Sequence, residues 1–413
     1  MLQDHKHRQY KKWNEYPAGP ESAALAADNM ARSVLLDDGS TWSNPDPVPY
    51  TRLGGTLRLG DTAHALVGAI NYSYGNYRIQ PQDPASVRFI PQNARPAEPK
   101  AKGNLVVASA NVLNYWTTIG CGDDCRGAQT EEQLAVQTEK LVDELLGTGA
   151  DIIGLQEIEN DSDHTPILTL VAALNAAEGS DVWSWIGPHE ANAYPIRNEI
   201  IYRNDRVETV GDPVTVVDPI FDTIPPGRTD PIGRRPVAQT FMFNGETFTV
   251  VSNHFKSKGC SGASGLDEDQ GDGQSCFNAT RVGQAQRVLE FVDDLIEDTG
   301  DPDVIVIGDL NAYLEEDPIL TLETELVNLV HEWDKDPYSY TFFAGFAAPW
   351  IGRGLLDYAL ATPSMADQVK RAEVWHINAD EPRFLDWYDP DLVAPGPYRA
   401  SDHDPVIVSL KLK

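Results

Sequence analysis

Apolar runs of five to nine residues alternate with amphipathic stretches along most of the chain beyond residue 104. Runs that predict buried strands lie at 105–112, 151–158, 199–203, 247–255, 303–311, 355–362 and 405–413. Stretches with helical apolar spacing lie at 131–149, 167–179 and 281–300. Because several neighbouring strands are joined by hairpin-like links, the pattern predicts an α/β sandwich of mixed sheets with helices outside.

The first part of the chain has a different pattern. Residues 1–33 are polar and have no regular period, whereas short apolar runs between residues 33 and 90 are broken by Asp-Gly, Gly-Asp and Pro, which is typical of β-hairpins. We expect a small all-β domain here, for which an OB-like barrel is one candidate fold. A proline-rich linker follows it, so we divide the chain into 1–98 and 99–413.

Polar side chains interrupt the apolar runs close to their ends. A buried carboxylate is costly unless it is paired or bound to a metal, so one such residue means little. Five strands that share this feature predict a single site at the strand ends. The residues concerned are Glu157, His254, Asp309, Asn311, Asp357, Asp402 and His403.

Carboxylates and amides suit a hard cation, which favours Mg²⁺ with Mn²⁺ as an alternative. Such an ion beside histidine and aspartate suits the attack of water on a phosphate. The loop with Asp267, Asp269 and Asp272 could hold a structural Ca²⁺, but it lacks the spacing of an EF-hand, so a solvated acidic loop is the favoured interpretation.

Charge is distributed unevenly over the 413 residues. Residues 1–98 carry 10 basic and 10 acidic residues, so the whole net charge of −31 belongs to residues 99–413. This excess argues against simple electrostatic binding of nucleic acid or of an anionic membrane. No apolar run is long enough for a membrane helix, and we expect neither a membrane nor an obligate protein partner.

The four cysteines form two local sets, and neither set is flanked by zinc-site spacing. Four cysteines allow three pairings, and four reduced thiols are the alternative. We favour the local disulfides Cys121–Cys125 and Cys260–Cys276, which imply an oxidising compartment. The first residues lack the apolar segment of a signal peptide, so a secreted protein would begin here inside a longer precursor.

The ordered motifs resemble those of the endonuclease/exonuclease/phosphatase superfamily, whose members are DNase I-like. They are ASANVLNYW, GLQEIEN, SNHFKSKG, QGDGQSCFNATRVGQAQ, GDLNAY, LDYAL and YRASDHDPV. Within the superfamily, they look like secreted bacterial nucleases over about residues 104–413, and the β region before them resembles the segment that precedes the nuclease domain. The resemblance implies a four-layer αββα sandwich with its site at one edge.

The resemblance also implies a set of metal ligands and catalytic residues. Glu157 is the principal metal ligand, Asn111 supports the metal or a phosphate oxygen, and Asp402 adds an acid on the metal side. Asp309 and Asn311 orient the attacking water and the scissile phosphate.

Two histidines complete the set implied by the resemblance. His403 faces the phosphate and pairs with Asp357, and His254 contacts the phosphate as the second histidine. Some relatives pair this second histidine with a glutamate; Glu199 is the nearest candidate, although its register does not match. Leu113 replaces an acid found in some members, which argues against a second metal there.

These features predict a secreted, Mg²⁺-dependent nuclease that cleaves DNA, with RNA as an alternative, and with little sequence specificity. The same chemistry on a small or lipid phosphodiester is a second hypothesis, and a non-catalytic binding module is a third. Arg281, at a predicted helix start, is a candidate phosphate clamp, although a surface salt bridge is an equal alternative. A nuclease with this charge needs a local basic patch, and the candidates are Arg197, Lys256, Lys258, Arg281 and Arg399.

Overall fold

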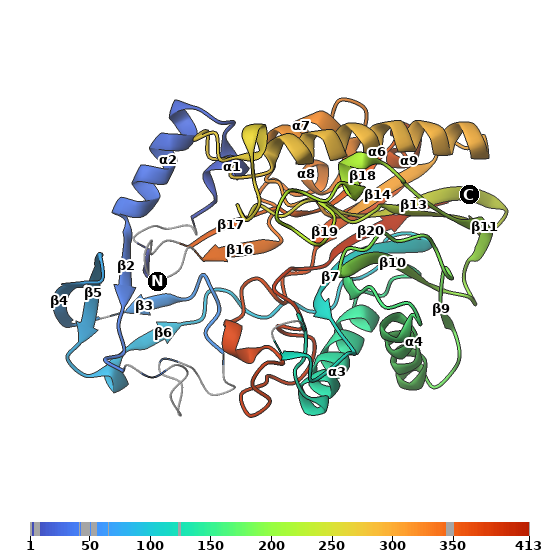
Figure 1. The fold of residues 1–413 in the computed structure, drawn as a ribbon. Coiled ribbons are helices and arrows are strands. Elements are labelled where there is room, and N and C mark those ends of the chain that lie inside the picture. The colour runs from blue at the N-terminus through green and yellow to red at the C-terminus, as the bar shows by residue number, and fades with distance from the viewer. Residues whose placement is uncertain are drawn as a thin grey trace.

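Two six-stranded β-sheets pack face to face in the computed structural model, and helices cover their outer faces (Figure 1). The structure describes residues 2–3, 9–40, 42, 50, 56–64, 66–122, 125–343 and 351–412. The architecture is the αββα sandwich of the DNase I-like fold, so the predicted fold class is confirmed.

The first sheet has the strand order β19-β20-β7-β8-β10-β9. Only β7 and β8 run parallel, whereas the other neighbours are antiparallel. Its strands are β7 (Leu105–Tyr115), β8 (Ile152–Glu159), β9 (Trp183–Trp185), β10 (Ile196–Arg203), β19 (Val369–Val374) and β20 (Val406–Leu410).

The second sheet has the strand order β11-β12-β13-β14-β18-β15. Here β13 and β14 are the parallel pair, so each sheet has one parallel step at its centre. Its strands are β11 (Glu208–Thr215), β12 (Val237–Phe243), β13 (Glu246–His254), β14 (Val304–Asp309), β15 (Val327–Asn328) and β18 (Asp357–Ala361).

Helices cover the two outer faces. Below the first sheet in Figure 1 lie α3 (Glu131–Gly147) and α4 (Thr165–Glu178), and above the second lie α6 (Asn278–Thr299), α7 (Asp317–Leu322), α8 (Leu329–Trp333) and α9 (Pro363–Ala366). Thr130 caps α3 by accepting a hydrogen bond from the Gln133 amide at 3.2 Å. Because α3 buries Leu141 and Leu145 at helical spacing, it packs on the sheet as its sequence predicts.

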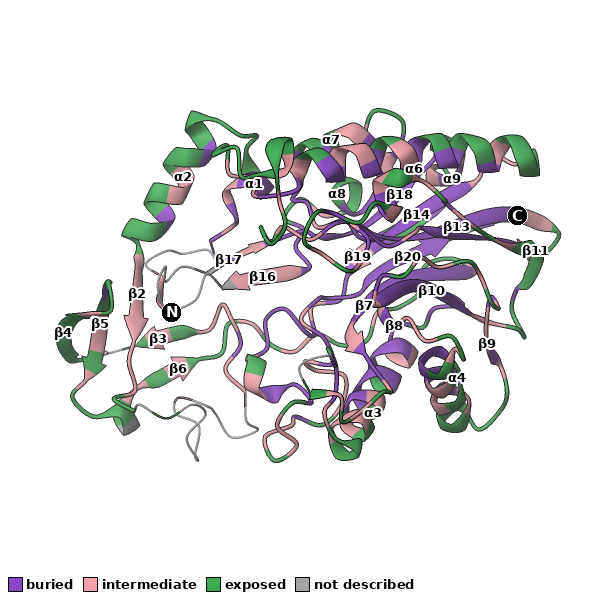
Figure 2. Ribbon diagram, in the orientation of Figure 1, coloured by how far each residue is buried: buried purple, intermediate pink, exposed green. Residues whose placement is uncertain are grey.

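The core strands are buried on both faces, as the burial colours in Figure 2 show for β7, β8, β13 and β14. Strands covered on both faces have continuous apolar runs, which is why the sequence predicts them well. The strands β11, β12 and β19 were not predicted. Strand β11 is largely exposed, β19 has two adjacent exposed positions, and Gln239 and Thr240 interrupt the apolar run of the buried β12. The helix α2 (Pro20–Ala31) was also missed, since its mostly exposed surface gives a weak apolar pattern.

The N-terminal strands form two small sheets. One has the order β1-β2-β5-β4 and the other pairs β3 with β6, so the described strands do not join into a single barrel. Most of their residues are exposed or half-buried (Figure 2). The strands are β1 (Leu2–Gln3), β2 (Ser33–Leu36), β3 (Thr62–His64), β4 (Gly68–Ser73), β5 (Asn76–Pro81) and β6 (Arg88–Ile90).

The N-terminal segment also packs against the sandwich. In the short helix α1 (Lys12–Glu15), Trp13 clusters with Tyr313 and Leu356, and the Asn14 side-chain oxygen accepts the Leu355 amide hydrogen bond at 2.8 Å. The neighbouring ladder pairs β16 (Tyr340–Phe343) with β17 (Ile351–Gly354). A further short helix, α5 (Pro219–Asp222), lies between β11 and β12.

A second contact joins the N-terminal part to the loop that follows β19. The buried carboxylate of Glu381 binds Arg58 and Arg95 and accepts a hydrogen bond from Thr56 at 2.7 Å. Arg58 also donates to the His376 carbonyl at 2.7 Å. We call this contact the Glu381 clasp.

The four cysteines pair locally, as predicted: Cys121 with Cys125 and Cys260 with Cys276. Each bond closes a short loop, and the second one encloses the acidic loop before α6. Within the described residues, no helix is both long and apolar enough to cross a membrane.

Candidate active site

Strand register places three of the predicted residues side by side in the second sheet. His254 ends β13 opposite Asp309, the last residue of β14, and Asp309 lies opposite Asp357, the first residue of β18. Three neighbouring strands therefore present an imidazole and two carboxylates at one edge, as the strand-end pattern predicts.

The first sheet presents its own polar residues at the same edge. Asn111 on β7 lies opposite Gln156 on β8, and Glu157 follows with a left-handed backbone at φ +70°. His403 precedes β20, which pairs with β7. The two sheets thus contribute one half of the site each.

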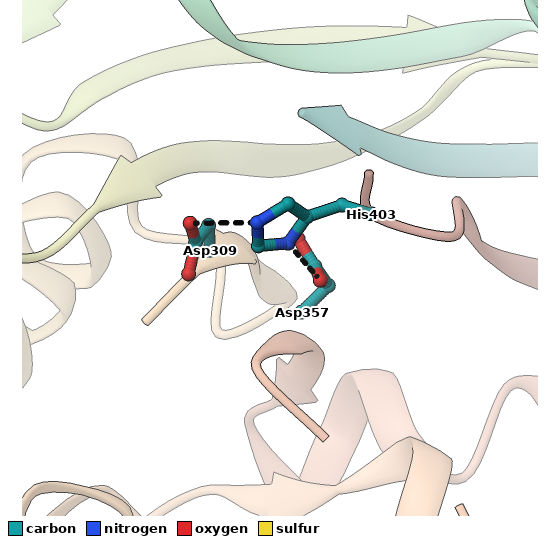
Figure 3. A group of neighbouring side chains, drawn as sticks. All are labelled: Asp309, Asp357 and His403. Atoms are coloured by element: carbon teal, nitrogen blue, oxygen red, sulfur yellow. Dashed lines mark hydrogen bonds and ion pairs between the residues drawn. The ribbon is translucent and has the colours of Figure 1, made fainter. Parts of the chain in front are cut away.

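Asp309 is the meeting point of these residues. One of its carboxylate oxygens, Oδ2, accepts hydrogen bonds from the side-chain amides of Asn111 at 3.2 Å and Asn311 at 3.3 Å. The same oxygen lies 3.3 Å from Nε2 of His254 and 3.9 Å from Nε2 of His403 (Figure 3). Side chains from both sheets converge on one buried carboxylate, so the predicted residues form one cluster.

His403 is held by a chain of short contacts. Its Nδ1 lies 2.7 Å from the Asp357 carboxylate (Figure 3). The same carboxylate also accepts a hydrogen bond from the Ser339 hydroxyl at 2.6 Å. The Ser339 oxygen in turn accepts from the amides of Leu356 and Asp357 at 3.0 Å. These contacts orient the ring so that Nε2 faces Asp309. Sequence reasoning predicted Asp357 but missed Ser339, which no motif marks.

The electrostatics of the cluster favour a charged His403. Burial lowers the pKa of this imidazole, but the carboxylates of Asp357 and Asp309 outweigh it and raise the pKa well above its usual range. Burial raises the pKa of the Asp309 carboxyl, and His403 partly opposes that shift. In contrast, burial and Arg234 hold the pKa of His254 well below its usual range, so this second imidazole is neutral.

Glu157 and Asp402 form the acidic side of the site. Glu157 accepts the Asn114 amide hydrogen bond at 2.9 Å through Oε2, and its Oε1 lies 4.0 Å from Nε2 of His254. Burial and then the Asp402 carboxylate raise the pKa of Glu157. Two acids beside the Asn111 amide are oxygen donors suited to a divalent cation.

Arg281 lies away from the cluster, which corrects its expected phosphate contact. Its side chain is fully buried, and its guanidinium donates to the carbonyls of Lys256 at 3.2 Å, Cys276 at 2.9 Å and Gln274 at 2.9 Å. Arg281 is therefore neither the phosphate clamp nor the surface salt bridge that the sequence suggested. It has a structural role, because its guanidinium holds the loop before α6.

Glu199 also lies outside the cluster. This buried carboxylate contacts Arg197 at 2.8 Å and His189 at 3.1 Å instead of His254. Within the described residues, Nδ1 of His254 has no hydrogen-bond partner. Glu199 therefore does not pair with His254, whose contact with Asp309 is made through Nε2.

A second polar network supports the backbone of His403. Asn378 donates to the His403 carbonyl at 2.7 Å and to the buried Glu144 carboxylate at 2.8 Å. The Asp404 carboxylate accepts from the Asn378 amide at 2.7 Å. The signal in the sequence was Glu144, an acid on the apolar face of α3 beside Leu145.

Glu144 predicts a pH-dependent stability. Burial raises its pKa to about 8, far above the unfolded value of about 4.3, so the folded protein prefers the protonated acid. That stabilisation is present at pH 4 and is lost as pH rises through 8. Glutamine stays neutral at every pH. As pH rises from 5 to 8, we therefore expect the unfolding free energy of Glu144→Gln to increase by about 1–3 kcal/mol relative to that of the native chain. Urea denaturation of both proteins at pH 5 and at pH 8 measures this difference in unfolding free energy.

The control is Glu139→Gln on the exposed face of the same helix. It should show no gain that depends on pH. Equal pH profiles for the two variants would contradict the assignment of the shift to Glu144.

Residues 108–403 match the Endonuclease/Exonuclease/phosphatase family. The match spans well over half of the chain, so the protein belongs to this family. Its members are phosphodiesterases and phosphatases that generally depend on a divalent metal, and this chain brings together Asp309, Asp357 and His403, whose ligand atoms lie within 4.8 Å of one another. No curated protein matches the chain.

Solved structures resemble the fold. A mannosyl-6-phosphatase from Bacteroides thetaiotaomicron is 19% identical with a TM-score of 0.48, covering 75% of this chain and 100% of its own. TDP2 from D. rerio, complexed with a single-strand DNA product, is 16% identical with a TM-score of 0.46, covering 74% and 97%. A family protein from Bacteroides vulgatus is 17% identical with a TM-score of 0.46, covering 75% and 99%.

Proposed function

We propose that this protein is a secreted, Mg²⁺-dependent nuclease that hydrolyses phosphodiester bonds of DNA, with RNA as an alternative, and with little sequence specificity. The observation that carries the proposal is the convergence of His254, His403, Asn111 and Asn311 on the Asp309 carboxylate. A carboxylate beside a charged imidazole suits a displacement at phosphorus. In this reaction water attacks and gives up a proton, negative charge grows on the phosphate oxygens, and the P–O bond to the leaving oxygen breaks as that oxygen takes up a proton.

The residues of the cluster then have the following tasks. Asp309 accepts a hydrogen bond from the attacking water and takes its proton, while the amides of Asn111 and Asn311 fix the carboxylate. The charged His403 donates to a phosphate oxygen, and Asp357 keeps the ring charged and oriented. His254 borders the same space from β13 and is neutral.

The metal ion fits the acidic side of the site. Glu157, Asn111 and Asp402 would hold it, because their carboxylate and amide oxygens are the donors that Mg²⁺ and Mn²⁺ prefer. When bound, the ion supplies Lewis-acid stabilisation of the phosphate charge. A structural Ca²⁺ at the loop before α6 has less support, since Asp267 already binds the amide and hydroxyl of Thr280.

The location outside the cytoplasm rests on the two disulfides, which persist in oxidising compartments. Mass spectrometry of the protein from culture medium, with thiols blocked before reduction, should find all four cysteines protected. Labelled thiols in the secreted protein would contradict this part of the proposal.

One assay tests the function and its main alternative. Circular and linear DNA, RNA and a lipid head-group diester are each incubated with the protein and Mg²⁺, with and without excess EDTA. We expect nicking of circular DNA that EDTA abolishes. The net charge of −31 favours the alternative, because it repels a long polyanion. Hydrolysis of the lipid diester without cleavage of nucleic acid would replace the nuclease with that alternative.

A further inference from the structure

Four cations gather around one tyrosine next to the candidate active site. We name Arg126, Arg228, Arg234 and Lys256, with Tyr194 at their centre, the cation cluster. The Cζ atoms of Arg234 and Arg126 lie 4.9 Å and 5.4 Å from the centre of the Tyr194 ring. Burial raises the pKa of the Tyr194 hydroxyl, but the charges of Arg234, Arg126 and Arg228 outweigh burial and lower that pKa. The cluster is thus a defined group of side chains rather than scattered surface charge.

The cation cluster adjoins Asp309 through a single residue. The Phe255 amide donates to the Asp309 carbonyl at 2.9 Å, and the Phe255 carbonyl accepts from both Asn311 at 3.2 Å and Arg234 at 2.9 Å. Lys256 is the next residue along the chain. A group bound by the cluster would therefore lie beside the phosphate attacked at Asp309.

Other cations that the sequence suggested for a basic patch do not belong to the cation cluster. Arg197 is paired with Glu199, and Lys258 is paired with the buried Glu316. Arg399 donates to the Asn378 carbonyl at 3.0 Å. Of the residues named from the sequence, Lys256 alone belongs to the cation cluster.

Few of the charges in the cluster have a direct ion-pair partner in the described part of the chain. Among the described residues, its one ion pair joins Arg228 to Asp230 at 2.6 Å. Arg234 and Lys256 are each 3% exposed. Nε of Arg234 has no hydrogen-bond partner in the described chain. The Lys256 ammonium contacts the Ser257 hydroxyl at 3.3 Å. Burial, Arg234 and Arg228 together lower the pKa of Lys256 to about 7.

Buried cations that repel each other are unfavourable unless an anion joins them. A guanidinium group fits the oxygens of a phosphate, and several of them can share one tetrahedral anion. In a chain with a net charge of −31, a cluster of cations is therefore suited to binding one anion. It attracts an anion at one point of a surface that otherwise repels anions.

We propose that the cation cluster is a subsite for a second phosphate of the substrate, adjacent to the phosphate that is hydrolysed. This inference rests on the proposed function and narrows it to substrates that carry neighbouring phosphates. The second group is a phosphate anion of either kind, a terminal monoester or an internal diester.

The test compares thymidine oligonucleotides that differ in their phosphates. TpT has only the scissile diester, pTpT and TpTp add a terminal monoester on either side, and TpTpT adds an internal diester. We expect kcat/KM about tenfold higher or more when a neighbouring phosphate is present. If only pTpT or TpTp is cleaved faster than TpT, the cluster binds a terminal monoester. If TpTpT is also cleaved faster than TpT, the cluster binds any adjacent phosphate.

The variants are Arg126→Gln and Arg228→Gln, which remove a charge from the outer side of the cluster and leave the buried Arg234 in place. Each should lower kcat/KM for the substrates with two phosphates about tenfold more than for TpT. The matched control is Arg371→Gln on β19, an exposed arginine paired with Glu373, which should keep the native ratio.

A binding measurement separates this inference from the nuclease proposal. Calorimetry in EDTA with thymidine 3′,5′-bisphosphate and with thymidine 5′-monophosphate needs no catalysis. We expect tighter binding of the bisphosphate in the native chain, and loss of that difference in Arg126→Gln. Equal affinities, or equal kcat/KM for all four oligonucleotides, would overturn the subsite. Absence of hydrolysis with the binding difference intact would overturn the nuclease proposal alone.

Discussion

Replacing His403 with alanine is expected to lower kcat/KM for diester hydrolysis about a thousandfold, because the charged imidazole facing Asp309 is removed. Asp357→Asn should cost about a hundredfold, since the ring remains but loses the carboxylate that keeps it charged. Initial rates on a fluorescent DNA substrate, together with thermal unfolding of each variant, measure both effects and separate them from misfolding.

The control is His331→Ala on α8, an exposed histidine away from the cluster. It should retain the native rate. Near-native activity of a folded His403→Ala protein would remove this histidine from the mechanism.

Arg281→Met is expected to lower the free energy of unfolding by about 3 kcal/mol or more. The change leaves three backbone carbonyls without the guanidinium that they bind in a buried environment. These carbonyls belong to Gln274, Cys276 and Lys256, so the loop closed by the second disulfide should loosen before the sandwich does. Urea denaturation and hydrogen exchange of the loop amides measure the two effects.

Arg287→Met is the matched control on the same helix, because its arginine is only partly buried and pairs with surface acids. It should cost less than about 1 kcal/mol. A similar loss for both variants would show that Arg281 contributes no more than an ordinary surface arginine.

The sequence predicts the central strands and much of the candidate site for the same reason. Strands buried on both faces have continuous apolar runs, and a polar residue at the end of such a run is conspicuous. Register then brings His254, Asp309 and Asp357 together without further information. Local disulfides were predictable because each joins cysteines at most 16 residues apart.

The residues that support the site could not be predicted in this way. Ser339, Asn378 and Tyr194 act through contacts with distant parts of the chain, and no local pattern distinguishes them from other polar residues. Arg281 was misjudged for a local reason. Helix α6 begins at Asn278 rather than at residue 281, so the arginine lies one turn inside the helix on its buried face.

The Glu381 clasp sets a limit on how the chain can be divided. A cut at the proline-rich linker after residue 98 would remove Thr56, Arg58 and Arg95 together. The remaining fragment would keep the Glu381 carboxylate without its counter-charges, close in the chain to Asn378. Removal of residues 1–98 would therefore take away the ion pairs that hold the loop with Asn378, whose side chain donates to the His403 carbonyl.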